Sequence, residues 1–328
     1  MAFRIIGSSH PKYLAATDIL IGDMAGINYE FLIYNRPIIL LANKWLCKNF
    51  PDIGIKTDLL NIEHAIIRSI EQPNEYEKQR KFWFKNTHHK PDGHSSERVL
   101  AAIIKHSKIS NPTLVFIHGN SDVLKSNVIP IFNEAKKQDL NSSLISHFSK
   151  TKHREGNVYI SANNSLLDFD KGYKVHIDHS LKSEGTNVFD IQIAQYKDKN
   201  YFKHTDLHIT EGEISQKRTK ILLGPYADRA IMIGYPKSDT LIRLNTVDNK
   251  EAVCNDLGFD PLLPLVTYAP AGKYKYPKKQ GASLNNSVII KLKEIGKSGN
   301  FNILIKLKYP RTWFFQRVLN KVISSLRM

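Results

Sequence analysis

The chain has 328 residues, and 41% of them are hydrophobic, which is enough apolar material for the cores of two domains. Its 47 lysines and arginines outnumber 31 aspartates and glutamates, giving a formal net charge of +16. Because the basic residues are spread along the chain, they favour phosphate-rich ligands, anionic membrane surfaces or nucleic acid as partners. The two cysteines, Cys47 and Cys254, have no CxxC spacing, so they indicate neither a disulfide framework nor a zinc site and fit a reducing compartment.

The apolar pattern indicates neither a membrane span nor a secretory signal. No run reaches the roughly 18 apolar residues that cross a bilayer, and the opening MAFRIIGSSH lacks the long apolar core of a signal peptide. We therefore expect a cytoplasmic protein, either soluble or peripheral on the inner face of the cell membrane. Residues 311–327 are basic and aromatic with helix-like apolar spacing, which fits either a helix lying on an anionic surface or a docked terminal helix.

Residues 18–37, DILIGDMAGINYEFLIYNRP, predict a buried strand, a turn of small residues, a helix and the start of a second strand. The turn follows Asp23, and the small side chains of Ala25 and Gly26 would let backbone N–H groups and the positive end of the helix approach an anion. Glu30 lies about one helical turn further on, where its carboxylate could accept hydrogen bonds from a ribose. The same pattern also fits an ordinary α/β unit that binds no ligand.

The rest of the chain alternates expected strands with expected helices. A polar region covers residues 71–97, and Ser96 is the expected cap of the helix that follows it. Further helices are predicted at 126–138 and 287–297, and strands at 114–117, 157–161, 173–178, 207–210, 230–235, 265–270 and 302–310. This alternation favours doubly wound α/β domains.

Several segments together resemble one protein family. YKVHIDHSLKSEG (173–185), HITEGEISQKR (208–218), IMIGYPKSDTL (231–241), VTYAPAG (266–272) and NILIKLKYPR (302–311) resemble, in that order, segments of the CDP-glycerol glycerophosphotransferase family of teichoic acid and capsule polymerases. Residues 8–41 also resemble this family, but they resemble the segment that normally comes last. The resemblance touches most of the chain.

The order of these segments implies a circular permutation. Residues 1–110 would be the second half of the nucleotide-binding donor domain, 111–255 the acceptor-side domain, and 256–328 the first half of the donor domain. The family has a GT-B fold, an α/β architecture of two Rossmann-like doubly wound domains facing a cleft. A rival explanation joins parts of two neighbouring family members or truncates one, which would leave the donor domain incomplete.

The resemblance also implies the reaction and its partners. The donor would be a CDP-linked polyol, carrying glycerol phosphate or ribitol phosphate, and the acceptor a lipid-linked polymer at an anionic membrane surface. CDP-polyol is a substrate, and no cofactor is expected. His179 is the candidate base, with Asp178 or a carboxylate across the cleft holding its tautomer. No metal site is predicted, because His176 and Asp178 would lie on one strand face and His179 on the other.

The residues expected to bind the donor lie in four segments of the sequence. They are Asp23, Ala25, Gly26, Glu30, Ala269, Pro270, Lys273, Lys308, Tyr309 and Arg311. Several depart from the family pattern: Lys308-Tyr309-Pro310 stands where the family has His-Pro, and Ala25-Gly26 stands where it has two serines. Ser180 and Glu184 replace a common Gly and Lys. Each lost donor removes about 1.5–3 kcal/mol from anion binding, which Lys308 or Arg311 would offset.

Two other functions remain open from the sequence. One is a GT-B nucleotide-sugar enzyme, either a glycosyltransferase or similar to UDP-sugar 2-epimerases, because an Asp-turn-Gly followed by Glu30 also serves nucleotide sugars. The other is a catalytically degenerate GT-B protein that binds a polyanion. Nucleic acid is a less favoured partner, because no aromatic-basic motif accompanies the charge. Residues 234–239 resemble a family turn expected to form the domain crossover and the cleft wall.

Overall fold

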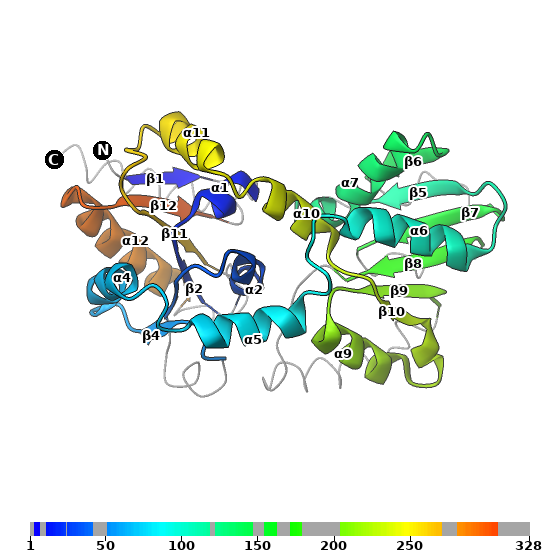
Figure 1. The fold of residues 1–328 in the computed structure, drawn as a ribbon, viewed down its shortest axis with the longest axis horizontal. Coiled ribbons are helices and arrows are strands. Elements are labelled where there is room, and N and C mark those ends of the chain that lie inside the picture. Colours follow the sequence, from blue (N-terminus) through cyan, green and yellow to red (C-terminus); the bar gives the residue numbers. More distant parts are fainter. Residues whose placement is uncertain are drawn as a thin grey trace. The chain divides into compact units, whose positions relative to one another are not determined.

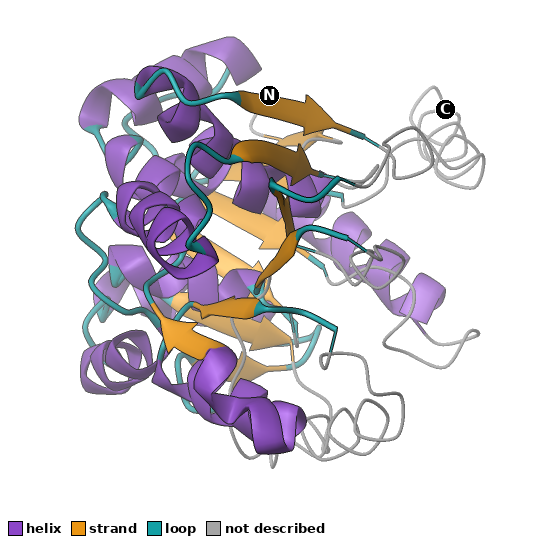
Figure 2. Ribbon diagram, turned by 90° about the vertical axis from the view of Figure 1, so that its right-hand side faces the viewer, coloured by secondary structure: helices purple, strands orange, loops and turns teal. Residues whose placement is uncertain are grey.

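The computed structural model divides the chain into two compact units. Unit 1 contains Met1–Lys48, Asp52–Glu77 and Leu244–Met328, and unit 2 contains Asn49–Pro51 and Lys78–Arg243. The structure describes residues 3–6, 11–23, 25–41, 51–118, 122–146, 154–162, 171–178, 204–270 and 281–307. Each unit holds one sheet of parallel strands with helices packed against it, and Figure 2 separates strands from helices by colour. The predicted doubly wound α/β class is therefore confirmed at the level of a Rossmann-like fold.

The sheet of unit 1 combines strands from both ends of the sequence. Its described strands, in spatial order, are β1 (Phe3–Ile6), β12 (Asn302–Lys306), β11 (Leu265–Ala269), β2 (Ile19–Gly22), β3 (Ile38–Leu41) and β4 (Ile55–Thr57). All neighbours are parallel, and the blue β1 lies beside the orange β12 in Figure 1. The strand at 302–306 and the strand at 19–22 thus share one sheet, as expected if the two ends fold together.

Helices cover both faces of the unit 1 sheet because its central strands are apolar throughout. Every residue of β2, β3 and β11 is buried. On one face, α4 (Ile62–Glu71) and α12 (Gly281–Lys297) join a core cluster with the strands. On the other face, the end of α1 (Pro11–Ala16) packs with α11 (Val247–Leu257). The short α2 (Ile27–Phe31) and the 3-10 turn η1 (Leu32–Tyr34) lead from β2 to β3.

The sheet of unit 2 comes from one continuous part of the chain. Its described strands, in spatial order, are β10 (Ala230–Met232), β9 (Leu207–Thr210), β8 (Tyr173–Ile177), β7 (Asn157–Ser161), β5 (Thr113–Ile117) and β6 (Ser142–Ile145). All neighbours are parallel. The apolar sides of α6 (Ser95–Ser107) and α7 (Asp122–Lys137) pack on one face of this sheet. The helix α9 (Glu213–Leu223) joins β9 to η4 (Gly224–Arg229), which leads into β10.

The structure divides the chain at other positions than the sequence predicts. Residues 71–97 contain the helix α5 (Glu77–Thr87), and α5 from Lys78 onward and α6 belong to unit 2 rather than with residues 1–110. The reason is that Val99, Leu100 and Ile103 of α6 are buried in the core of unit 2. Conversely, α11 belongs to unit 1, because Val253 and Cys254 are buried against its sheet.

The start of α6 is capped by a residue distant in sequence, which corrects the predicted role of Ser96. Asp239, in the first turn of α10 (Pro236–Arg243), is buried and accepts hydrogen bonds from Ser95 N at 2.9 Å and Ser96 N at 2.7 Å. It also accepts one from Ser96 Oγ at 2.7 Å. A carboxylate is the favoured partner for the exposed N–H groups of a helix start. Asp239 therefore connects the start of α10 to the start of α6 inside unit 2, and we call these three hydrogen bonds the Asp239 clamp.

Candidate functional site

The unit 1 sheet has a topological switch point between β11 and β2. Counted in the order β11, β12, β1, β2, β3 and β4, the strands lie in the spatial order 3-2-1-4-5-6. This is the order of dinucleotide-binding Rossmann sheets, which bind ligands where the strand order reverses, at the carboxyl ends of the central strands. The pairing of Ala269 with Gly22 places these two ends side by side. The candidate site of unit 1 is therefore the edge formed by the ends of β11 and β2.

The two strands of this edge are locked together at their other ends as well. The backbone N–H of Leu265 donates to Asp18 Oδ2 at 2.7 Å, and the N–H of Asp18 donates to Leu265 O at 2.9 Å. The hydroxyls of Thr17, which precedes β2, and of Thr267 in β11 are 2.6 Å apart and buried. The position of β11 against β2 is thus fixed by polar contacts in addition to the ladder.

The turn after β2 is built around a close approach between Gly22 and Asn28. A Cβ added to Gly22 would overlap Asn28 Oδ1, so the position has room only for glycine. Asn28 is fully buried, and its Nδ2 donates to the carbonyl of Asp23. The N–H of Ala25 also donates to that carbonyl, at 2.8 Å. Asn28 therefore holds the turn in shape, a role that the sequence pattern did not reveal.

The predicted donor-binding residues of this turn lie at the switch point. Asp23 is 4% exposed and directly follows β2. Gly26 is the N-cap of α2, but α2 has only five residues, so its dipole is weaker than expected for a full helix. Glu30 is 7% exposed. Burial raises the pKa of the Tyr34 phenol, and the negative charge of Glu30 acts in the same direction. The site thus holds two buried carboxylates on one short segment.

The other predicted donor-binding residues divide into two groups. Ala269 is the last residue of β11 and pairs with Gly22 at the end of β2, and Pro270 follows it; both are buried. Lys273, Lys308, Tyr309 and Arg311 lie outside the described residues, as does the candidate base His179. The structure therefore brings together Asp23, Ala25, Gly26, Glu30, Ala269 and Pro270 in unit 1.

In unit 2, Asp178 directly follows β8 and faces helix α9. Its carboxylate accepts a hydrogen bond from Arg218 Nη2 at 3.3 Å, and Thr219 Oγ1 lies 3.5 Å from it. Its backbone N–H donates to Ile209 O at 3.0 Å, which continues the pairing of β8 with β9. Arg218 is 4% exposed, so this is a buried ion pair at the carboxyl edge of the sheet. The pair fixes the last described residue before His179.

The face of β8 and β9 beneath α9 is polar. His176 and His208 have ring centroids 5.3 Å apart, and both are buried. Further along the same edge, Ser215 of α9 donates to the buried carboxylate of Glu211. Buried polar side chains such as these are unusual on the face of a parallel sheet, which normally buries aliphatic side chains. Among the described residues, no group of histidine, cysteine or carboxylate side chains is arranged to hold a metal ion.

Unit 2 has its own switch point. Counted along the chain from β5 to β10, its strands lie in the spatial order 2-1-3-4-5-6, so the strand order reverses between β5 and β7. His118 follows β5, and Ser161 ends β7 with its hydroxyl donating to Ile117 O at 3.3 Å. The position of His118 beside a strand reversal becomes visible only from the sheet order.

Comparison with known proteins gives no match: no family model, no curated protein and no solved structure is similar enough to this chain to be matched. Over the residues that the structure describes, no helix has both the length and the apolar character needed to cross a membrane.

Proposed function

We propose that the chain is a permuted GT-B transferase that moves a polyol phosphate, glycerol phosphate or ribitol phosphate, from a CDP-linked donor to a hydroxyl of a lipid-linked glycan acceptor. Unit 1 would hold the nucleotide and unit 2 the acceptor, on the cytoplasmic side of a membrane. The donor is a substrate, and the proposal invokes no metal and no cofactor.

One observation carries the proposal: β11 and β2, from opposite ends of the sequence, are adjacent at the switch point of one sheet. The segments that contain them, VTYAPAG and DILIGDMAG, resemble parts of the first and of the second half of one donor domain in the proposed family. A permuted donor domain requires them to meet, whereas parts of two neighbouring family members, or a truncated one, would leave the donor domain incomplete. The order 3-2-1-4-5-6 is also complete only when β12 is followed by β1.

The reaction assigns each group a task. An acceptor hydroxyl oxygen attacks the phosphorus that carries the polyol, the bond from that phosphorus to the bridging oxygen breaks, and CMP leaves with the electron pair. His179 takes the hydroxyl proton. The ion pair with Arg218 would fix Asp178, the residue that precedes His179 in the sequence. The turn after β2, held by Asn28, would present backbone N–H groups to the diphosphate, and Glu30 would accept from the ribose.

Release of CMP tests this function. The full chain is incubated with CDP-glycerol or CDP-ribitol and a phosphodiester glycan acceptor, and we expect CMP and an extended polymer. His179→Ala should lower turnover by about 100-fold or more, the usual contribution of a general base. Transfer at a near wild-type rate in that variant would remove His179 from the mechanism.

Two other outcomes would replace the proposal. Release of UDP from a UDP-sugar, with none of CMP, would favour a glycosyltransferase or an epimerase-like enzyme, which also uses a carboxylate in the position of Glu30. Polymer binding without any turnover of either nucleotide would favour the degenerate polyanion-binding protein. The assay therefore separates the three functions with two donors and one acceptor.

A further inference from the structure

Helix α5 presents a basic face with an aromatic side chain at its centre. Lys78, Lys81 and Lys85 are exposed and, at a spacing of three or four residues, lie on one side of the helix. Phe82 lies among them and is 60% exposed, with its ring against Trp83 at a centroid distance of 5.6 Å. Lysines beside an exposed phenyl ring suit a partner that is both anionic and apolar.

Helix α9 and the following η4 repeat this combination. Lys217 and Lys220 are exposed, Ile221 is 46% exposed, and Tyr226 is 39% exposed. The guanidinium of Arg229 lies over the Tyr226 ring, 4.2 Å from its centroid. Three basic residues therefore surround two exposed apolar side chains.

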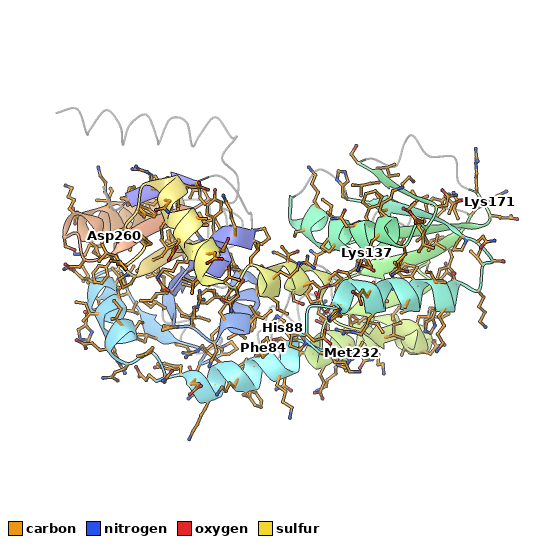
Figure 3. The ribbon with its side chains drawn as sticks, turned by 45° about the horizontal axis from the view of Figure 1, so that its top comes forward. Phe84, His88, Lys137, Lys171, Met232 and Asp260 are labelled. Carbon is orange, nitrogen blue, oxygen red and sulfur yellow. The ribbon has the colours of Figure 1, made fainter. Side chains whose placement is uncertain are left out.

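The two helices meet within unit 2. A Cβ added to Gly212, the N-cap of α9, would overlap the carbonyl of Thr87, the last residue of α5. The backbone N–H of His89 donates to Glu211 O at 2.8 Å, which ties the end of one helix to the start of the other. The ring of His88, just after α5, lies 4.7 Å from that of Phe84 and 6.3 Å from that of Tyr235, measured between centroids. Figure 3 labels Phe84 and His88. We call the exposed lysines and the exposed large apolar and aromatic residues of these helices and η4 the basic surface: Lys78, Lys81, Phe82, Lys85, Lys217, Lys220, Ile221 and Tyr226.

The charge of the basic surface is positive. Its five lysines compare with three acidic residues on the same elements, the half-buried Glu77 and the exposed Glu213 and Asp228. Lys78, Lys85 and Lys220 have no ion pair within the part of the chain that the structure describes, whereas Lys137 and Lys171 lie 3.6 Å and 3.9 Å from a glutamate. Figure 3 labels these last two lysines in unit 2. Exposed lysines around a phenylalanine and an isoleucine match lipid headgroups above acyl chains.

We propose that the basic surface binds an anionic lipid bilayer, with its lysines at the headgroups and Phe82 and Ile221 inserted between them. Nucleic acid fits less well, because bases stack on aromatic rings and make no use of an exposed isoleucine. This inference rests on the proposed function only in the reason for binding a membrane, which is that the proposed acceptor is linked to a lipid. The binding itself needs neither donor nor acceptor.

Co-sedimentation of the full chain with vesicles tests the proposal. The chain should bind vesicles with phosphatidylglycerol as about one lipid in three and not vesicles of phosphatidylcholine alone, and added salt should weaken binding. Each lysine at the surface contributes about fivefold to the partition coefficient, so the triple variant K78Q/K85Q/K220Q should bind roughly a hundredfold more weakly. Phe82→Ser should lower binding further at high salt, where charge is screened.

Matched variants decide between a specific surface and general charge. K105Q/K137Q/K171Q removes the same charge from exposed lysines elsewhere in unit 2, and Leu262→Ser removes an apolar side chain that is 90% exposed in unit 1. Both should bind like the wild type. Equal losses in the two triple variants, or binding to RNA but not to vesicles, would overturn the proposal. Vesicle binding without CMP release contradicts only the proposed function, and CMP release without vesicle binding contradicts only this surface.

Discussion

The two units build similar sheets from very different parts of the chain. Unit 2 uses the nearly continuous stretch Lys78–Arg243, and each of its strands is close in sequence to a neighbour in space. Unit 1 places β11 and β12 from one end of the sequence between β1 and β2 from the other. Because β11 and β2 form its candidate site, that site exists only when the two chain ends come together. The sheet of unit 2 does not depend on the chain ends. Deleting one end should therefore disrupt the candidate site of unit 1 and leave that of unit 2 intact.

Removing residues 244–328 should produce the largest effect, because it deletes β11 and β12 from the sheet of unit 1. We expect residues 1–243 to retain one cooperative unfolding transition, that of unit 2, and to lose the other entirely. Limited proteolysis should then digest residues 1–77 while leaving 78–243 intact. Supplying residues 244–328 as a separate chain should restore protection, and protection of 1–77 without them would show that unit 1 does not depend on both ends.

Asp239 provides the corresponding test inside unit 2, where the important contacts are local polar ones. Asp239→Ala removes a buried carboxylate and leaves the N–H groups of Ser95 and Ser96 without their acceptor. We expect unit 2 to lose about 3 kcal/mol or more of unfolding free energy, with unit 1 unchanged. Denaturant titration of the full chain measures both transitions. Asp228→Asn, at an exposed aspartate of the same unit, should change neither, and an equal loss there would show that the clamp is not the cause.

Gly22→Ala tests the candidate site of unit 1 with a smaller change. The new methyl would overlap the amide of Asn28, so we expect a loss of about 1–3 kcal/mol confined to unit 1. A double-mutant cycle with Asn28→Ala sharpens the test, because removing the amide removes the overlap. The two losses should therefore be less than additive. Strict additivity would mean that the contact between Gly22 and Asn28 does not shape the turn.

The sequence predicts best those elements whose residues are apolar on both faces. The strands at 157–161 and 207–210 have the predicted bounds, because central parallel strands read as continuous apolar runs. The short strands β1 and β4 were missed, since edge strands of three or four residues lack such a run. Helix α5 was missed for another reason: it buries Arg80 and Thr87 in place of aliphatic residues, so its sequence has no apolar period.

The residues of the candidate site also divide into those that the sequence predicted and those that it did not. The residues after β2 were predicted from the pattern of a strand, a turn of small residues and a helix, and those at the end of β11 from the proposed resemblance. The sheet places the ends of these two strands side by side. Asn28 gave no signal, because its importance depends on the bare Cα of Gly22 in the preceding strand. Arg218 was missed because an arginine in a charged helix normally faces solvent. Its burial depends on Asp178, which is 40 residues away in sequence.

Asp92 and Arg98 give the smallest expected effect and contrast with the buried clamp at Asp239. Arg98 Nη1 donates to both carboxylate oxygens of Asp92 at 2.8 Å, and this contact lowers the pKa of Asp92. A carboxyl whose pKa is lower in the folded state stabilises the fold above its unfolded pKa, about 4, and loses that contribution as the pH falls through the folded value. The Asp92 side chain is 52% exposed, so solvent and salt reduce the contribution to about 0.5 kcal/mol. Asp92→Asn should therefore cost unit 2 that amount at neutral pH and low salt, less in high salt, and almost nothing once the pH is well below 4. A loss that persists in acid would mean that Asp92 does not act through its charge.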